Sequence, residues 1–478
     1  MTSRLGPRPA AVAATGLALC AALLSPLPAT ATGTDRQAAG AERPSAGSAG
    51  VGDPLFPKAG NGGYRVGHYD LRLKYAPQRR MLRATATISA RTTKALSSFH
   101  LDLYGLRVDR IVVDGEVARW TRRGQELVVR PDGPLAADAA FTTRVRYHGS
   151  PRTYIDPDGS RDGWSYTDDG AVVASEPVGA MTVFPANNHP SDKARFDVAI
   201  TVPDHLKAVS KGILTGRRSS QGWTTWRWHE PDQMATYLMT ATIGRFRMLR
   251  DRGPGGLPIW SFIDPRTSGA KAIAQRIPAV LRRLEKWYGD YPFVSSGVIV
   301  DRSRLGYALE VQTRPLFDGT PDMSTLVHEL AHQWYGNAVS PRTWQHIWLN
   351  EGFATYTEWL WAAQMLTATP GAAQARFDRL YREPAGSSLW SPPPADPGSA
   401  ANLFGRPVYD RGAMAMHALR KEVGWSTFLR ISRRWAQVHG GGSARTSQLR
   451  TLAERVSGQP LGRLFSDWVW LDGKPDGY

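Results

Sequence analysis

The sequence of 478 residues contains a single cysteine, Cys20, so no disulfide bond can form within the chain. It also contains no run of basic residues longer than a pair, although 49 arginines and 10 lysines contribute to a net charge of +17. Without a concentrated basic stripe, this charge does not predict nucleic-acid binding. We expect no nucleic-acid partner and interpret the positive excess as a solvated basic surface.

Apolar runs long enough to cross a membrane are also absent, and the one pronounced apolar run lies near the start of the chain. Residues 1–31 contain two arginines, an apolar run over residues 11–24 and a small-residue cleavage site that ends at Ala31. This order is typical of a secretory signal peptide. We expect cleavage near Ala31, which removes Cys20, and a secreted, extracellular protein with no stable membrane span.

The composition excludes disorder and collagen-like repeats for most of the chain. Hydrophobic residues make up 42%, aromatic residues 10% and charged residues 21%, and 17 residues are tryptophan. These are the proportions of a globular protein with a core rich in large aromatic side chains. The length predicts two or three domains rather than one.

The first half of the chain has the pattern of a β-sheet domain. Residues 32–57 are rich in alanine, glycine and serine and are expected to form a flexible linker. Over residues 58–250, apolar and polar residues alternate, as at Tyr69, Leu71 and Leu73, and Asp-Gly turns separate the runs. We predict an N-terminal antiparallel β-sheet domain over residues 58–250.

The second half has the residue spacing of helices. A cluster of glycine and proline at residues 252–256 is interpreted as the boundary, so that the second domain covers residues 256–478. Apolar residues recur at helical spacing near residues 273–287, 322–336, 350–364, 408–422, 426–437 and 459–470. The segment between residues 370 and 407 is rich in proline, glycine and serine and is expected to be largely loop.

The strongest chemical signal is the motif H-E-L-A-H over residues 328–332. His328 and His332 lie four residues apart, so on a helix both imidazoles can bind one metal ion. Glu329 lies near the same face and can act on a water molecule without binding the metal. A chance match is the alternative, but the helix-start residue Asp322 precedes the motif and favours a true helix.

Glu351 is the candidate for a third ligand, because a catalytic zinc ion usually has three protein ligands. It follows His332 by 19 residues, which is enough for a loop and a return along an antiparallel helix. Two imidazoles and one carboxylate suit Zn²⁺. Taken alone, Glu351 could be an ordinary acidic residue at a helix start, where the helix dipole favours it.

The motif at residues 328–332, followed by eighteen residues and Glu351, resembles the gluzincin metalloaminopeptidases of the aminopeptidase N and leukotriene hydrolase type. Further segments are similar to that family, namely residues 332–337 (H-Q-W-Y-G-N), 348–356 (W-L-N-E-G-F-A-T-Y), 409–413 (Y-D-R-G-A) and 185–194 (P-A-N-N-H-P-S-D-K-A). The resemblance covers residues 58–478. It implies a multidomain α+β fold, in which an N-terminal antiparallel β-sheet domain precedes a thermolysin-like, mainly helical catalytic domain with one Zn²⁺.

The resemblance also implies a role for each residue of the motif. His328, His332 and Glu351 would bind the zinc ion, and Glu329 would be the general base toward a zinc-activated water. Tyr409, which begins the segment Y-D-R-G-A, would stabilise the oxyanion through its hydroxyl group. Without the resemblance, Tyr409 would be interpreted as a packing residue.

Glu310 and Glu176 are the candidates for binding the amino terminus of a peptide. Residues 306–310 (G-Y-A-L-E) resemble the exopeptidase motif of the family, although Leu309 and Val311 replace its methionine and asparagine. Glu176 matches the family's second amine-binding position, in the sheet domain. A pair of carboxylates is a suitable partner for an ammonium group. We expect peptide substrates with free amino termini and a monomeric enzyme, against the simpler interpretation of two unrelated surface acids.

Two other functions stay open. An endopeptidase of the thermolysin type shares the three ligands, but carboxylates at Glu310 and Glu176 would be of no use to it. A non-catalytic binding protein that retains the metal motif is disfavoured by the intact Glu329 and Tyr409.

Many relatives carry a further helical domain that this short form is expected to lack, because only 127 residues follow Glu351. We therefore expect an open site that admits longer peptides, unless the segment between residues 370 and 407 covers it.

Overall fold

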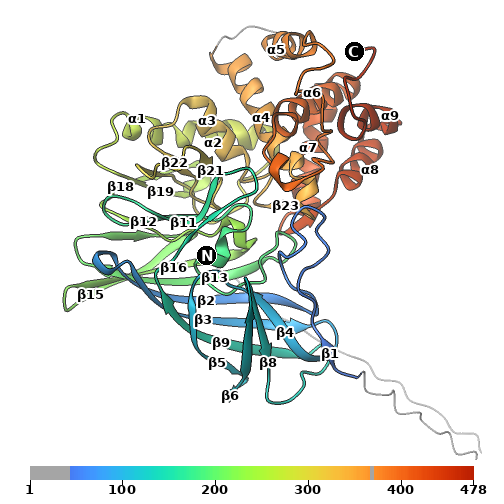
Figure 1. The fold of residues 1–478 in the computed structure, drawn as a ribbon. Coiled ribbons are helices and arrows are strands. Elements are labelled where there is room, and N and C mark those ends of the chain that lie inside the picture. The colour runs from blue at the N-terminus through green and yellow to red at the C-terminus, as the bar shows by residue number, and fades with distance from the viewer. Residues whose placement is uncertain (1–42, 367–370) are drawn as a thin grey trace, which may run out of the picture. The chain divides into compact units, whose positions relative to one another are not determined.

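Alternating apolar residues in the first half of the chain form an eight-stranded sheet, in the order β15-β16-β13-β2-β3-β9-β5-β6 (Figure 1). In β2 (Tyr64–Ala76), Leu71 and Leu73 are buried, whereas Arg72 between them is exposed. The pairs within the sheet are antiparallel, apart from the parallel pair β13 and β2. The other strands are β3 (Met81–Thr92), β5 (Arg107–Val113), β6 (Glu116–Val117), β9 (Ala140–Gly149), β13 (Ala194–Pro203), β15 (Ile213–Ser220) and β16 (Trp223–Met234).

Two smaller sheets complete this half. One has the order β1-β4-β8-β7, with β1 (Ser45–Ala46), β4 (Leu96–Asp102), β7 (Arg119–Arg123) and β8 (Glu126–Arg130). The other has the order β10-β11-β12-β17-β14, with β10 (Thr153–Ile155), β11 (Arg161–Tyr166), β12 (Ala171–Ala174), β14 (Lys207–Val209) and β17 (Thr242–Gly244). β11 contacts the second half of the chain, because the Tyr307 hydroxyl donates a hydrogen bond of 2.5 Å to the Arg161 carbonyl.

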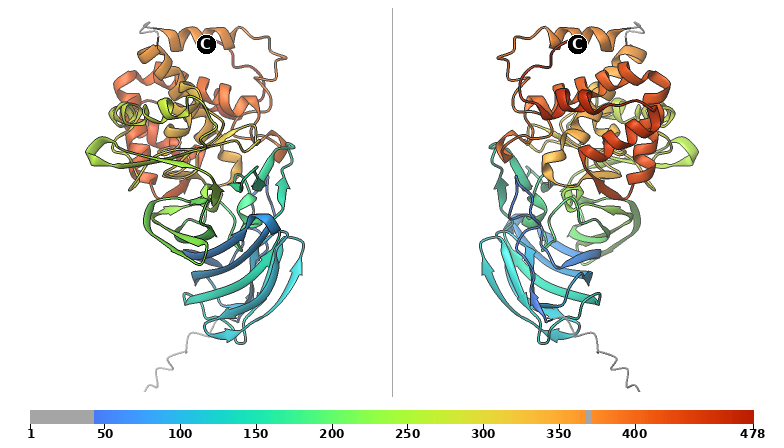
Figure 2. Two further views of the ribbon diagram at one scale, coloured as in Figure 1. Left: turned by 90° about the vertical axis from the view of Figure 1, so that its left-hand side faces the viewer. Right: turned by 90° about the vertical axis from the view of Figure 1, so that its right-hand side faces the viewer.

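The second half is built on a five-stranded sheet, β18-β19-β20-β22-β21, which lies beside a group of helices (Figures 1 and 2). Its strands are β18 (Arg247–Arg252), β19 (Pro258–Ile263), β20 (Ile299–Asp301), β21 (Ala308–Leu309) and β22 (Leu316–Asp318), and a separate parallel pair joins β23 (Val339–Pro341) to β24 (Gly442–Ala444). The helices are α1 (Ala270–Ala274), α2 (Ile277–Tyr288), α3 (Met323–Ala331), α4 (Trp348–Trp361), α5 (Ala372–Tyr381), α6 (Gly412–Val423), α7 (Trp425–His439), α8 (Thr446–Ser457) and α9 (Gly462–Phe465). The predicted α+β fold, a sheet domain followed by a mainly helical domain, is confirmed.

This computed structural model describes residues 43–366 and 371–478, all within the unit Glu42–Tyr478. The expected signal peptide at residues 1–31, and the part of the expected linker up to residue 42, lie outside the described residues. Within the described ranges, no helix is both long and apolar enough to cross a membrane.

Residues 43–57 differ from the flexible linker expected there, because they are packed against the rest of the fold. β1 pairs with β4, and the buried Asp53 carboxylate accepts backbone hydrogen bonds from Phe56 (2.9 Å) and Trp344 (2.7 Å). It also lies 3.0 Å from the ring of His189. Small residues are common both in mobile linkers and in segments whose backbone packs closely against another strand. Composition alone therefore did not predict that this segment is packed.

The glycine and proline cluster at residues 252–256 also differs from the domain boundary expected there. It forms the turn between β18 and β19, which pair with each other. The five-stranded sheet of the second half therefore begins at Arg247, before this cluster. The segment between residues 370 and 407 contains α5, and α8 was not predicted at all. Leu449, Leu452 and Ala453 are buried and Val456 packs against the core, so α8 has a helical spacing that the expected elements did not include.

Candidate active site

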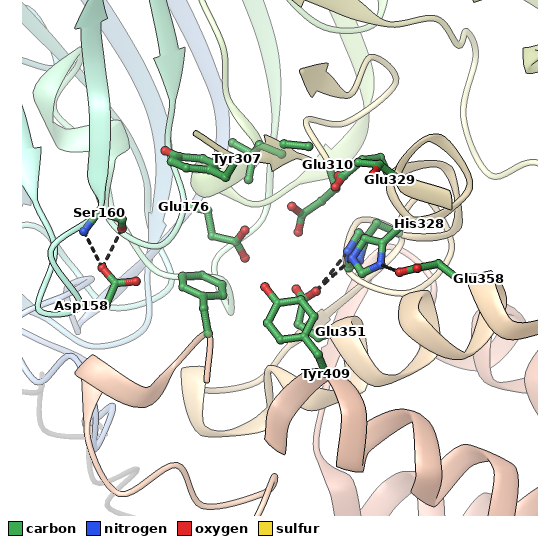
Figure 3. A pocket seen from close by; sticks show the side chains of 15 residues that line it. Asp158, Ser160, Glu176, Tyr307, Glu310, His328, Glu329, Glu351, Glu358 and Tyr409 are labelled. Carbon is green, nitrogen blue, oxygen red and sulfur yellow. Dashed lines mark hydrogen bonds and ion pairs between the residues drawn. The ribbon is translucent and has the colours of Figure 1, made fainter. Parts of the chain in front are cut away.

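All seven residues singled out in the sequence line one cavity of about 410 Å³ (Figure 3). They are Glu176, Glu310, His328, Glu329, His332, Glu351 and Tyr409, which come from both halves of the chain. The wall also includes Tyr307, Glu358 and Phe404. The fold therefore brings together residues that lie more than 200 positions apart in the sequence.

α3 begins where the sequence predicts a helix start. The Asp322 side chain accepts a hydrogen bond of 2.8 Å from the Thr325 backbone amide, which caps the helix. Leu326, Leu330 and their apolar neighbours bury one face of the helix, and this fixes the direction of the two histidines. The rings of His328 and His332 lie 4.6 Å apart between centroids, on one side of α3 and its end.

Each histidine has its Nδ1 atom occupied by an acceptor. His328 Nδ1 lies 2.7 Å from a carboxylate oxygen of Glu358, and His332 Nδ1 donates to the Tyr335 carbonyl at 3.0 Å. Because Nδ1 carries the proton in this arrangement, Nε2 is left as the unprotonated ligand atom. The two Nε2 atoms lie 3.2 Å and 3.4 Å from the same Glu351 oxygen. Two imidazole nitrogens and one carboxylate oxygen within 4.8 Å of one another fit a zinc ion.

Glu351 lies in the first turn of α4, which packs against α3. Burial opposes the ionisation of Glu351, but the nearby His332 and His328 outweigh it and lower the pKa of this carboxyl to about 2. Glu351 is therefore an anion at neutral pH, as a carboxylate ligand must be.

Tyr409 lies in a short helical turn, Pro407–Arg411, directly before α6. Its ring is stacked on His328, with 6.1 Å between ring centroids and 24° between planes. The turn comes close to α4 because Gly352 and Gly412 face each other; a Cβ atom on Gly352 would lie 2.8 Å from the Gly412 carbonyl carbon. Two glycines therefore allow the Tyr409 hydroxyl to point into the cavity (Figure 3).

Glu329 follows His328 on α3 and is buried beside Glu310 and His332. One oxygen from each of these carboxylates and one nitrogen of His332 lie within 4.8 Å of one another. Burial raises the pKa of Glu329 to about 8, although both histidines oppose this effect. Its Oε2 atom has no hydrogen-bond partner among the described residues and is free for a molecule in the cavity.

Glu310 and Glu176 face each other across the cavity (Figure 3). Glu310 follows β21, and its carbonyl accepts hydrogen bonds from the side chains of Gln333 (3.0 Å) and Asn337 (2.6 Å). Glu176 precedes Pro177 in the sheet half. Only 2% of Glu310 and 8% of Glu176 is exposed, yet the Oε1 atom of each has no hydrogen-bond partner among the described residues. Burial, and then repulsion from neighbouring carboxylates, raises the pKa of Glu176 well above its usual range.

Eight of the fifteen residues that line the cavity were not singled out in the sequence, among them Glu358, Tyr307 and Phe404. Glu358 could have been found, because it follows Glu351 by seven residues, which is two helical turns on one face of α4. Tyr307 and Phe404 carried no such signal: they reach the cavity from a loop before β21 and from the segment between residues 370 and 407. That segment, which we considered as a cover of the site, therefore contributes Phe404 to the cavity wall.

Glu358→Gln should weaken zinc binding about 10- to 100-fold, because the neutral amide holds His328 in position less firmly than the carboxylate does. Competition with a chromogenic chelator measures the zinc dissociation constant. The exposed Glu422 in α6 offers a matched control, and Glu422→Gln should bind zinc as the wild type does. Equal zinc affinity in both variants would show that Glu358 does not support the metal site.

Comparison with known proteins matches both halves of the chain to domains of one peptidase family. Residues 66–238 match the Peptidase M1 N-terminal domain, and residues 309–468 match the Peptidase family M1 domain. Aminopeptidase M1-D of Oryza sativa subsp. japonica is 27% identical over 333 residues, which cover 64% of this chain and 37% of the rice protein. Leucyl aminopeptidase of Saccharolobus solfataricus is 25% identical over 330 residues, which cover 64% of this chain and 42% of that protein. The chain thus spans less than half the length of these curated relatives.

Solved structures match over nearly their whole length. An M1 zinc metallopeptidase from Deinococcus radiodurans has a TM-score of 0.81 and 29% identity, over 89% of this chain and 99% of that one. A two-domain M1 zinc metallopeptidase bound to L-tryptophan has a TM-score of 0.81 and 30% identity, over 90% of this chain and 100% of that one. Together with the two domain matches and the three side chains grouped as candidate zinc ligands, these similarities confirm the resemblance found in the sequence: the chain belongs to the M1 family of zinc metallopeptidases.

Proposed function

We propose that the protein is a zinc-dependent aminopeptidase, which hydrolyses the first peptide bond of substrates with a free amino terminus. The observation that carries this proposal is the pair of buried carboxylates, Glu176 and Glu310, whose oxygens lie within 4.8 Å of each other and of a Glu351 oxygen. No arginine or lysine of residues 43–366 and 371–478 forms a salt bridge with either carboxylate. An ammonium group from a substrate would supply the missing positive charge.

The hydrolytic step needs a base and a donor for the developing negative charge. Bound zinc would supply a Lewis acid that polarises the scissile carbonyl and lowers the pKa of a water molecule. Glu329 would take a proton from the attacking water and later donate it to the leaving amine. Tyr409, whose ring is stacked on that of His328, would donate a hydrogen bond from its hydroxyl group to the oxyanion.

The geometry also favours cleavage at the end of a chain over cleavage in its middle. Glu176 reaches the cavity from the sheet half and faces Glu310, and one oxygen of each lies within 4.8 Å of an oxygen of Glu351 (Figure 3). An ammonium group bound between these carboxylates would place the first peptide bond beside the candidate metal ligands. A blocked or internal peptide unit would place neutral atoms against two buried carboxylates, at a cost of about 1–3 kcal/mol for each unsatisfied group.

Tyr409→Phe should reduce kcat by about 10²- to 10³-fold while the KM value changes little, because the hydroxyl acts on charge that develops only in the transition state. Steady-state kinetics on an aminoacyl amide provide both values. Tyr307→Phe serves as the control, since the Tyr307 hydroxyl lines the same cavity but donates to the Arg161 carbonyl. Equal losses in the two variants would remove the oxyanion role of Tyr409.

Glu310→Gln should raise the KM value for substrates with a free amino terminus by about 10- to 100-fold. The reason is the loss of a charge-assisted hydrogen bond to the ammonium group, which contributes about 1.5–3 kcal/mol. Glu176→Gln should have the same kind of effect, because both carboxylates would contact one ammonium group. The measurement is kcat/KM for a series of free aminoacyl amides. An unchanged kcat/KM in both variants would contradict the ammonium site.

The order of products from an unmodified tripeptide tests the proposed function directly. One D. radiodurans relative was crystallised in a Glu-to-Ala variant bound to the peptide Tyr-Ser-Ala, which makes this tripeptide a suitable substrate to assay here. Mass spectrometry of a timed digest should detect free tyrosine and Ser-Ala first, and a chelator should stop their release. Early release of alanine or of Tyr-Ser, or cleavage inside longer blocked peptides, would favour a carboxypeptidase or an endopeptidase.

The organisation and location of the protein are proposals that rest on sequence. Secretion with cleavage near Ala31 rests on the signal-like pattern of residues 1–31, and a monomer is the expected state in solution. We assign residues 58–250 to the sheet domain and residues 256–478 to the catalytic domain, with the difference at β18 noted above. N-terminal sequencing of secreted protein and light scattering would test the first two proposals.

A further inference from the structure

The arginines that are scattered in the sequence gather on the outward face of the eight-stranded sheet. Strand pairing places Arg72, Arg146 and Arg110 in one row across β2, β3, β9 and β5, with Thr85 between the first two. The next row contains Lys74, Arg83 and Arg107, with His148 between the last two. The six basic residues of these two rows form what we call the basic sheet patch, and all six are exposed.

The charge of the basic sheet patch is poorly compensated by carboxylates. Arg72 pairs with Asp70 at 3.2 Å, and the nearby Asp109 pairs with His148 rather than with an arginine. In residues 43–366 and 371–478, no carboxylate lies within salt-bridge distance of the other five basic residues. These side chains therefore produce a concentrated positive field that the linear sequence does not reveal.

The patch also surrounds a hollow of about 410 Å³ on the sheet surface. Arg72, Arg83 and Arg146 line it together with Thr85, His148 and Asp109, and the Asp109 carboxylate is paired with His148. Neighbouring strands are about 4.8 Å apart and alternate residues along a strand are about 6.7 Å apart, so these groups can contact one phosphate from several sides. Guanidinium groups bind phosphate oxygens in pairs of parallel hydrogen bonds, which suits arginine for this ligand.

We infer that the basic sheet patch binds a linear polyanion that carries phosphate groups along its chain. The two rows of cations extend across four strands, so their charge complements a chain of several anionic groups better than one isolated anion. Neutralisation of several phosphates releases their counterions, so binding should be strong at low salt and fall steeply as salt is added.

Two other anionic partners fit the patch less well. A single-stranded nucleic acid would need aromatic side chains for base stacking, and the outward positions of the two rows hold none. The neighbouring Trp223 ring is already covered by the Lys74 ammonium, 4.4 Å from its centroid. A membrane surface would favour exposed apolar side chains beside the cations, and the two rows contain none. A phosphate-bearing polymer requires neither stacking nor insertion.

The position of the patch leaves the active site accessible. β2, β3, β9 and β5 lie at the end of the structure away from α3 and α4, which carry the zinc ligands (Figure 1). A bound polymer would hold the enzyme in place without entering the catalytic cavity. Hydrolysis of small substrates should therefore proceed unchanged whether or not the patch is occupied.

The test compares two triple variants of the zinc-loaded protein with the same change in net charge. The side chains of Arg83, Arg110 and Arg146 form no hydrogen bond or salt bridge among the described residues, so the variant R83Q/R110Q/R146Q keeps the backbone pairing of the sheet and should fold normally. The control R282Q/R434Q/R455Q removes three exposed arginines from α2, α7 and α8. Binding of fluorescent polyphosphate is measured by anisotropy at several salt concentrations.

The wild type should bind polyphosphate with a steep salt dependence, and the control should bind it almost equally well. The patch variant should bind more weakly, and the slope of log affinity against log salt should fall by about 3, or about 1 for each arginine. All three proteins should hydrolyse an aminoacyl amide at the same rate. Equal weakening in the two variants, no binding by the wild type, or binding only to phosphatidylglycerol vesicles would overturn the inference.

Discussion

Glu329→Gln should retain zinc and the fold but lose about 10²- to 10⁴-fold in kcat, the range that general acid–base catalysis contributes. The amide is almost the same size as the carboxylate but cannot accept a proton. Because Glu329 Oε2 makes no hydrogen bond to the described residues, the substitution removes no contact that supports the structure. The expected loss therefore comes from the chemical step rather than from folding.

Measurement of kcat, bound zinc and the circular dichroism spectrum separates these contributions. Glu329→Asp keeps the carboxylate on a shorter side chain and should have an intermediate kcat, which a purely structural role would not produce. If Glu329→Gln binds zinc normally and still turns over at the wild-type rate, another group is the general base.

Removal of the metal should abolish activity, and Glu351→Ala should do the same by weakening the site. A chelator is expected to reduce wild-type kcat/KM to background, and added zinc should restore it. In Glu351→Ala the two histidines lose the carboxylate whose oxygen lies 3.2 Å and 3.4 Å from their Nε2 atoms, so the same zinc concentration should not restore activity.

Thermal unfolding provides a second readout that does not depend on turnover. Zinc at a thousand times its dissociation constant stabilises a folded protein by about 4.1 kcal/mol, so the Tm of the wild-type apoprotein should rise when zinc is added. The Tm of Glu351→Ala should change much less at the same concentration. A zinc-dependent rise of equal size in both proteins would show that Glu351 is not a ligand.

The sequence predicted the candidate site more completely than the surrounding fold, and the reason is local geometry. His328 and His332 are placed by one helical turn, and a helix start at Asp322 is visible in the sequence. Glu310 and Glu176 depend on the junction between the two halves of the chain, so they could be found only through the resemblance to a family. Glu358 was missed, although its place two helical turns after Glu351 on one face of α4 was a local signal that could have indicated it.

Other features depend on long-range pairing that no local pattern records. β1 looks like linker sequence because its stability comes from β4, more than 45 residues away. The turn between β18 and β19 has the composition of a domain boundary, since glycine and proline end strands in either context. The basic sheet patch is the clearest case: Arg72, Arg110 and Arg146 become neighbours only through the register of four strands.

The proposed aminopeptidase activity is tested most directly by one substrate with and without a free amino terminus. Leucine 7-amido-4-methylcoumarin and its N-acetyl derivative share the scissile bond and differ only at the group that Glu176 and Glu310 would bind. We expect efficient, chelator-sensitive hydrolysis of the free amine and a loss of at least about 100-fold in kcat/KM on acetylation. Equal hydrolysis of the two compounds by the zinc-loaded enzyme would contradict the proposed activity.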